Sequence, residues 1–122
     1  MNQTPPSPDE AGGAVLNADT IRAMRAMAGE AGFGRIRAQF LSSSAQAVAE
    51  LARAAAAGDE DVLRRKAHML KGSSSSMGAC GLEALCVELE EALAGAPGAD
   101  RAAIVARMAG ALESARRALA EV

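Results

Sequence analysis

Apolar residues recur in steps of three and four along most of the chain, and this spacing limits the possible folds more than any other feature of the sequence. The clearest example is residues 59–77, where one face of a helix would carry Leu63, Ala67, Leu70, Ser74 and Met77. Side chains three and four residues apart share a helix face, whereas a half-buried strand needs strict alternation, which is not found. Only 2% of the residues are aromatic, so the core must be built from aliphatic side chains, which favours packed helices.

Capping residues and turns divide this pattern into five predicted helices. The predicted boundaries are Asn17 or Asp19, the sequence GEAGFG at 29–34, Gly58 with Asp59, Gly81, and the GAPGA turn at 95–99 with Asp100. The apolar positions of the first helix are expected to be Ile21, Met24 and Met27. The apolar faces of the others are expected to carry Phe33, Ile36, Phe40, Ser44, Ala47, Leu51 and Ala55 on the second helix, Leu82, Leu85, Cys86, Leu89 and Leu93 on the fourth, and Ile104, Met108, Ala111, Ala115, Leu119 and Val122 on the last. Short connections between the four longer helices predict an all-α antiparallel up-down-up-down four-helix bundle, with a short N-terminal cap helix.

The start of the chain differs in composition from the rest. Residues 1–15 are rich in Pro, Gly and polar residues and are expected to form a disordered tail, which leaves 16–122 as one helical domain. The sequence has no signal-peptide pattern and no apolar run of the roughly 18 residues that a membrane span needs, so a cytoplasmic protein is expected. The net charge of −2, without a basic stripe interleaved with aromatic residues, argues against nucleic-acid binding.

The only histidine lies in the segment AHMLKGSSSSMGA, residues 67–79. On a helical wheel His68 points about 140° from the centre of the apolar stripe, so we expect it on the surface. Lys71 and Gly72 fall on the same flank, one turn further along. A glycine inside a helix costs about 1 kcal/mol relative to alanine, which suggests that space is needed beside the ring. An ordinary surface histidine is the alternative interpretation of this pattern.

Residues 67–90, AHMLKGSSSSMGACGLEALCVELE, resemble the histidine-containing phosphotransfer (Hpt) domain of bacterial and fungal phosphorelays. The matching positions, at unbroken spacing, are Ala67, His68, Leu70, Lys71, Gly72, Ser73, Gly78, Leu82, Cys86, Leu89 and Glu90. With the looser surroundings included, the resemblance covers about residues 16–122. It implies a four-helix bundle with an N-terminal cap helix, in agreement with the periodicity, and the role of a stand-alone phosphoryl carrier.

The resemblance implies that His68 accepts a phosphoryl group from a receiver-domain aspartate and passes it to the receiver of another response regulator. The ordinary pKa of imidazole is about 6.5, so a neutral ring nitrogen is a good nucleophile near pH 7. Phosphoryl transfer needs mainly positioning and charge neutralisation. We therefore expect Lys71 to offset part of the phosphoryl charge and Gly72 to leave room. Glu90 is expected to accept a hydrogen bond from Nδ1–H of His68, which leaves Nε2 free.

Four further side chains are expected to contact the partner. Arg64 and Arg65 would steer an acidic receiver surface, although the two are explained equally well as ordinary solvated charges on a helix. Met69 would belong to an apolar docking patch. Ser75 is expected to lie beside His68. No intrinsic cofactor is expected, and the Mg²⁺ of the reaction would belong to the partner receiver domain. The expected partners are response-regulator receiver domains and a hybrid histidine kinase, and the protein is expected to be a monomer without an ATP site of its own.

Four alternatives make different demands on the sequence. A dimerising histidine kinase typically has an acidic residue directly after the histidine, where this chain has Met69. The phosphoacceptor domain of a chemotaxis-type kinase is harder to separate from a stand-alone protein, which the short length and the Met1 start favour. A helical adaptor without phosphotransfer would tolerate loss of His68. Metal binding by His68, Cys80 and Cys86 does not fit the usual close spacing of ligands.

Overall fold

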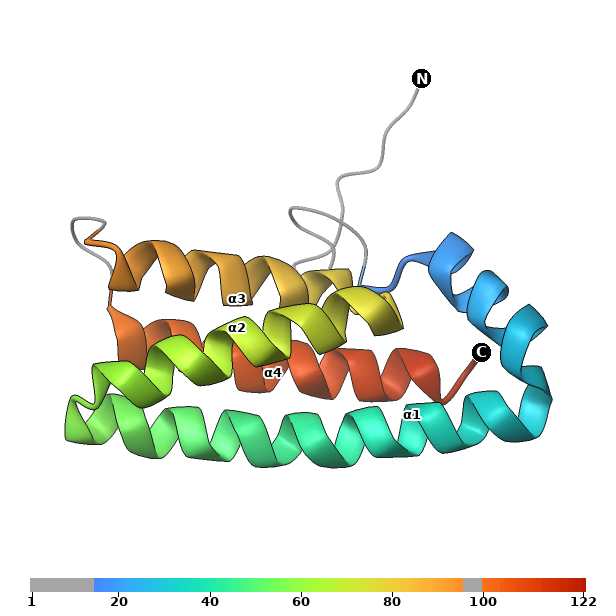
Figure 1. The fold of residues 1–122 in the computed structure, drawn as a ribbon, viewed down its shortest axis with the longest axis horizontal. Coiled ribbons are helices and arrows are strands. Elements are labelled where there is room, and N and C mark those ends of the chain that lie inside the picture. The colour runs from blue at the N-terminus through green and yellow to red at the C-terminus, as the bar shows by residue number, and fades with distance from the viewer. Residues whose placement is uncertain (1–14, 96–99) are drawn as a thin grey trace, which may run out of the picture.

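The chain folds into helices throughout the part that the structure, a computed structural model, describes, which is residues 15–95 and 100–122. The elements are α1 (Ala18–Ala57), α2 (Glu60–Met77), α3 (Cys80–Leu93) and α4 (Arg101–Leu119), and no strand occurs among these residues (Figure 1). The predicted all-α class is therefore confirmed. Nearly all of the predicted tail at 1–15 and most of the predicted GAPGA turn lie outside the described residues.

The three predicted capping side chains are present. Asn17, Asp59 and Asp100 each accept a hydrogen bond from the backbone N–H three residues further on, at 3.0–3.2 Å, and they begin α1, α2 and α4. Helix α3 begins at Cys80, two residues earlier than predicted, so Gly81 lies inside its first turn. The first N–H groups of a helix have no acceptor within the helix. The N–H of Gly81 donates to the carbonyl oxygen of Val15, at 3.5 Å.

Helix α1 bends at Gly29, inside the predicted interruption. This residue has φ 74° and ψ 172°, a backbone conformation that glycine adopts far more readily than other residues, and the helix continues on both sides of it. Figure 1 shows the segment before the bend leaving the axis of the rest of α1. The described glycines with positive φ are Gly29, Gly58, Gly78 and Gly95, so Gly32 and Gly34 stay helical.

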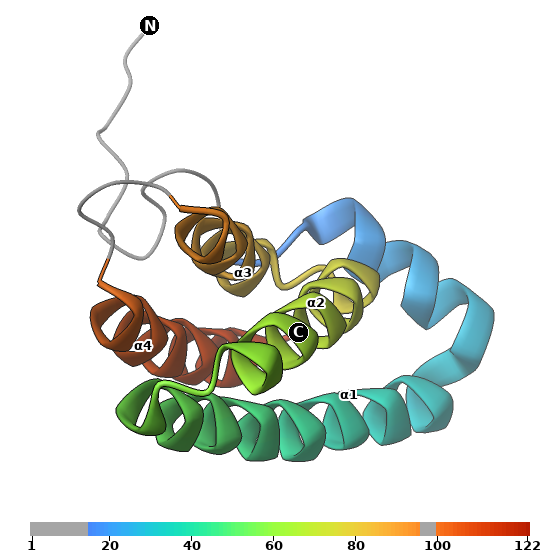
Figure 2. The same cartoon turned by 60° about the vertical axis from the view of Figure 1, so that its left-hand side comes forward.

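The core lies between helices that each pack against two others. The contacting pairs are α1 with α2, α2 with α3, α3 with α4 and α1 with α4, which is the ring visible in Figure 2. The predicted apolar stripe of α2 is buried along its whole length. The hydroxyls of Ser44 and Ser74 are also buried, and neither has a hydrogen-bond partner among the described residues. None of the described helices combines the length and apolar character needed to cross a membrane.

Three residues predicted on apolar faces are exposed instead. Met27, in the α1 segment before the bend, is 88% exposed. Val122 is 40% exposed because α4 ends at Leu119, so the wheel no longer applies to it. Ile36 is 41% exposed, and it lines a groove with Ser73 and Ser76 of α2. These serines are too small to cover the isoleucine, so its position on the wheel did not determine its burial.

Gly58 and Gly78 form a matched pair for a stability test, because both are left-handed C-caps with φ of 70° and 78°. A Cβ at Gly78 would lie 3.1 Å from Cβ of Thr20 and 3.3 Å from the carbonyl oxygen of Asn17, whereas one at Gly58 would meet nothing within 4 Å. We expect Gly58→Ala to lower the free energy of unfolding by about 1 kcal/mol and Gly78→Ala by about 2–3 kcal/mol. Urea denaturation measures both, and equal losses would contradict the close contact at Gly78.

Candidate functional site

His68 lies near the middle of α2, on the side that faces away from the core. Its neighbours Ala67 and Leu70 are buried, whereas 74% of the His68 side chain is exposed. The cap at Asp59 sets where the helix begins, and the buried stripe fixes which face turns inward. The predicted exposure of the histidine is confirmed.

Glu90 of α3 brings His68 and Lys71 together. One carboxylate oxygen, Oε2, lies 3.3 Å from Nδ1 of His68, and the other, Oε1, accepts a hydrogen bond of 2.8 Å from Nζ of Lys71. The side chains of Lys71 and Glu90 are 32% and 26% exposed, so this ion pair is partly shielded from water at the α2–α3 interface. The contact predicted between Glu90 and His68 is present, and the contact between Glu90 and Lys71 was not predicted.

The charge on Glu90 decides which ring nitrogen of His68 carries the proton. The hydrogen bond from Lys71 lowers the pKa of the Glu90 carboxyl, the proximity of His68 lowers it further, and partial burial opposes both. Glu90 is therefore ionised at neutral pH and can only accept, so Nδ1 of His68 must be the donor. In a neutral ring the lone pair then lies on Nε2, and the hydrogen bond that the described residues make to the ring is the one at Nδ1.

Gly72 leaves open space beside the ring. A Cβ at this position would meet nothing within 4 Å, and the residue is exposed. The packing of the chain itself therefore does not require glycine here. Since residues four apart are neighbours on a helix surface, the space lies next to His68.

Comparison with known proteins agrees with this geometry. A family model, the Hpt domain, matches residues 35–119. The chain belongs to the Hpt domain family. Among solved structures, it is similar to the crystal structure of histidine-containing phosphotransfer protein B (HptB) from Pseudomonas aeruginosa PAO1, with a TM-score of 0.80 and 27% identity, covering 88% of this chain and 92% of that one. No curated protein matched the chain.

The residues of this Hpt domain that were predicted to contact a partner are spread over α2. Arg64 forms ion pairs with Glu60 at 3.9 Å and Asp61 at 3.5 Å, so the acidic first turn of its own helix already engages it. Arg65 lines a cleft of about 420 Å³ between α1 and α2. Met69 is 60% exposed beside His68, and Ser75 is also exposed. The structure thus brings together His68, Lys71 and Glu90, whereas the two arginines lie one turn nearer the start of α2, where Arg64 pairs with Glu60 and Asp61 and Arg65 lines the cleft.

A groove of about 720 Å³ on the Hpt domain was not predicted. It runs between α1 and α2, and its lining includes Met24, Ile36, Phe40, Ser73, Ser76 and Met77. The run of small serines on α2 was a sign of it in the sequence, because serines opposite an apolar face leave that face uncovered. One of them, Ser73, donates its hydroxyl to the Leu70 carbonyl oxygen at 3.2 Å, so it is satisfied within its own helix.

The described part of the Hpt domain contains no group of three or more His, Cys, Asp or Glu side chains placed to hold a metal ion. Cys86 is fully buried, and burial raises the pKa of its thiol to about 12. A protonated thiol in the core is a poor metal ligand. The alternative of a metal site made by His68, Cys80 and Cys86 is therefore unsupported.

Proposed function

We propose that this Hpt domain carries phosphoryl groups between receiver domains, with His68 as the carrier. Membership of the family and the likeness to HptB support phosphotransfer as the function. The observation that supports His68 as the carrier is its exposed ring, whose Nδ1 faces an ionised carboxylate and whose Nε2 is left for reaction.

In the proposed step, the lone pair on Nε2 of His68 attacks the phosphorus of an aspartyl phosphate on the receiver. The Nε2–P bond forms, the acyl P–O bond breaks, and the receiver's aspartate leaves as a carboxylate. The ring keeps its Nδ1 proton and becomes positively charged, and Glu90 stabilises that charge. Lys71 lies one turn away and offsets the phosphoryl charge, while Mg²⁺ on the receiver supplies the remaining neutralisation. Transfer to a second receiver is the reverse reaction.

The receiver is proposed to dock over the groove between α1 and α2. Met69 extends this apolar surface to the side of His68, because Ser73 and Ser76 follow it at the four- and seven-residue spacing of one helix face. Gly72 leaves space between this surface and the ring. Arg35 lines the groove and Arg65 the neighbouring cleft, which suits an acidic receiver surface.

The finer architecture also belongs to this proposal. We infer an up-down-up-down bundle in which the α1 segment before Gly29 is the cap. Tight connections at Gly58–Asp59 and Gly78–Ala79 support it, as does the colour sequence in Figure 1, where consecutive helices run in opposite directions. The domain limits 16–122, the stand-alone and monomeric state, the cytoplasmic location and a hybrid histidine kinase as the donor system stay predictions.

Radiolabelled phosphoryl transfer tests the proposal. The protein is incubated with receiver domains phosphorylated on aspartate, and acid-labile, alkali-stable label is expected to appear on it and to pass to a second, unlabelled receiver. Label that arrives only from an ATP-binding kinase domain would favour the chemotaxis-type alternative. No label from any receiver and none from phosphoramidate, a small donor that phosphorylates histidine directly, would contradict phosphotransfer and favour the adaptor.

Glu90→Ala is expected to change the state of the His68 ring. Without the carboxylate, Nδ1 loses its acceptor, so the proton should redistribute towards Nε2 and labelling by phosphoramidate should slow roughly tenfold or more. Nitrogen NMR of the imidazole measures the tautomer, and Glu91→Ala, which removes the exposed neighbouring carboxylate, is the matched control. An unchanged tautomer would mean that Glu90 does not orient the ring.

The lowered pKa of Glu90 also predicts a pH dependence of stability. A carboxyl whose pKa is lower in the folded state than in the unfolded state stabilises the fold when the pH is above the ordinary pKa of 4.5. This contribution is lost as the pH falls through the lowered pKa of the folded state. The difference in unfolding free energy between wild type and Glu90→Ala should therefore be present at neutral pH and shrink in acid. A difference that stays constant across this range would contradict the assignment.

A further inference from the structure

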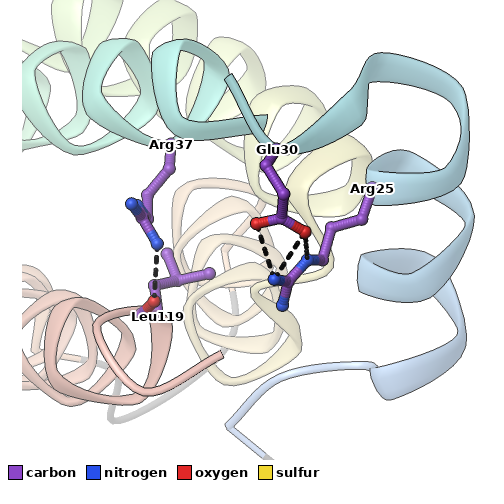
Figure 3. Close-up of polar contacts among 4 residues, drawn as sticks. All are labelled: Arg25, Glu30, Arg37 and Leu119. Carbon is purple, nitrogen blue, oxygen red and sulfur yellow. Dashed lines mark hydrogen bonds and ion pairs between the residues drawn. The ribbon is translucent and has the colours of Figure 1, made fainter. Parts of the chain in front are cut away.

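The bend in α1 is bridged by one ion pair (Figure 3). Arg25 lies before Gly29 and Glu30 after it, and the guanidinium contacts both carboxylate oxygens, with Nε 3.1 Å from Oε2 and Nη2 2.8 Å from each oxygen. A Cβ at Gly29 would meet nothing within 4 Å, so conformation and not crowding explains the glycine. Because the backbone at Gly29 is not helical, a continuous helix does not fix the angle between the two segments, and contacts across the bend contribute to it.

The second contact of Arg25 is a fixed aromatic ring. Its guanidinium carbon lies 5.2 Å from the centroid of Phe33, which is 1% exposed, and that of Arg37 lies 5.4 Å from the same centroid. Arg37 also donates a hydrogen bond of 3.2 Å to the carbonyl oxygen of Leu119, the last residue of α4, as Figure 3 shows. Phe33 is thereby tied to the bundle, and Arg25 ties the segment before the bend to Phe33.

The segment before the bend contributes one residue, Met24, to the lining of the groove between α1 and α2. Its start is held at the α2–α3 turn, where the N–H of Asn17 donates to the Gly78 carbonyl oxygen at 2.7 Å. Met24 comes from the middle of the segment, and it lines the groove together with Met77 of α2 and Phe40. A change of the angle at Gly29 would therefore move Met24 relative to the rest of the groove lining.

We propose that Arg25 is a latch: its contacts with Glu30 and Phe33 set the angle at Gly29, and this angle sets the width of the groove that receives the receiver domain. Arg25 is thus a positioning residue, remote from His68. The side chain of Glu30 is 77% exposed and that of Arg25 is 31% exposed, so the ion pair is open to screening by salt and can be released. This proposal rests on the proposed function only in naming a receiver domain as the molecule that binds in the groove.

Methionine methyl NMR tests the latch without a partner. In Arg25→Ala the Met24 methyl should change shift and gain mobility, while the Met108 methyl, fully buried in the core, should not. Arg22→Ala is the matched control, because Arg22 pairs with Asp19 inside the same segment and does not cross the bend. Raising the salt concentration should move Met24 of the wild type in the direction of Arg25→Ala. Equal Met24 spectra in the two alanine variants would overturn the latch.

A second measurement tests the link to docking. Phosphoramidate needs no docking surface, so Arg25→Ala and Arg22→Ala should be labelled at the wild-type rate, whereas transfer from a phosphorylated receiver should fall severalfold in Arg25→Ala alone. Unchanged receiver transfer despite a mobile Met24 would overturn the role of groove width. Failure of phosphoramidate to label even the wild type would contradict the proposed function instead, and the result for Met24 would still decide the latch.

Discussion

His68→Gln is expected to reduce phosphoryl labelling to background, from a receiver and from phosphoramidate alike. His68 is the only histidine in the chain, and no other side chain here offers an imidazole nitrogen to form the acid-labile, alkali-stable bond. Glutamine retains a side-chain amide that can donate to Glu90, and the site is 74% exposed, so the fold should be preserved. The label is counted on the separated protein after acid and alkali treatment.

Phosphoramidate, the small donor, shows whether a loss of labelling comes from the nucleophile or from docking. Loss of receiver transfer alone would also follow from damaged docking, whereas loss of phosphoramidate labelling can only follow from loss of the nucleophile. Circular dichroism and the urea midpoint check that the variant is folded. Acid-labile label that survives in His68→Gln would rule out His68 as the carrier and with it the proposed function.

Gly72→Leu is expected to make the protein more stable and much less active. Gly72 and Gly110 are both exposed helical glycines, and a Cβ at either would meet nothing within 4 Å. Leucine is a better helix former than glycine, so each substitution should raise the free energy of unfolding by about 0.5–1 kcal/mol. Only at position 72 does the new side chain fill the space beside His68, where a displaced reacting group costs on the order of a hundredfold in rate.

Gly110→Leu therefore serves as the control for Gly72→Leu. The expected result is a similar rise in the urea midpoint for both variants, with receiver-dependent transfer reduced on the order of a hundredfold in Gly72→Leu and unchanged in Gly110→Leu. Equal transfer rates in both would mean that the partner does not use the space at Gly72. A loss of stability in Gly72→Leu would mean that the glycine serves the fold.

The features of the site that depend on local sequence could be predicted. Asp59 caps α2, the periodic apolar residues fix its inward face, and these two facts place His68 on the surface with Gly72 beside it. The family resemblance added Glu90 as the partner of the ring. The hydrogen bond from Lys71 to the same Glu90 carboxylate was not predicted. It depends on how α3 is rotated against α2, which is set by packing between the helices and cannot be read from the helical wheel of either one.

The features that depend on distant packing were missed. Ile36 has the right spacing for the core, but its burial depends on which α2 residues lie opposite, and those are serines. Helix α3 begins at Cys80 because the carbonyl oxygen of Ala79 accepts the N–H of Glu83, and Val15, from outside the bundle helices, accepts the N–H of Gly81. The groove and the Arg25–Glu30 ion pair across Gly29 likewise depend on how two segments are placed in the folded chain, and this placement cannot be predicted from the spacing of residues.

Loading the carrier changes the net charge of the site by about one unit, because the ring becomes positive as the phosphoryl group is added. In the empty site the neutral ring, Glu90 and Lys71 sum to no net charge. In the loaded site the charged ring, a phosphoryl group of about two negative charges, Glu90 and Lys71 sum to about one negative charge. The positive ring, stabilised by Glu90, thus offsets about half of the added phosphoryl charge. A receiver that removes the group meets a site about one charge more negative than the receiver that delivers it, so the two partners face different electrostatic surfaces.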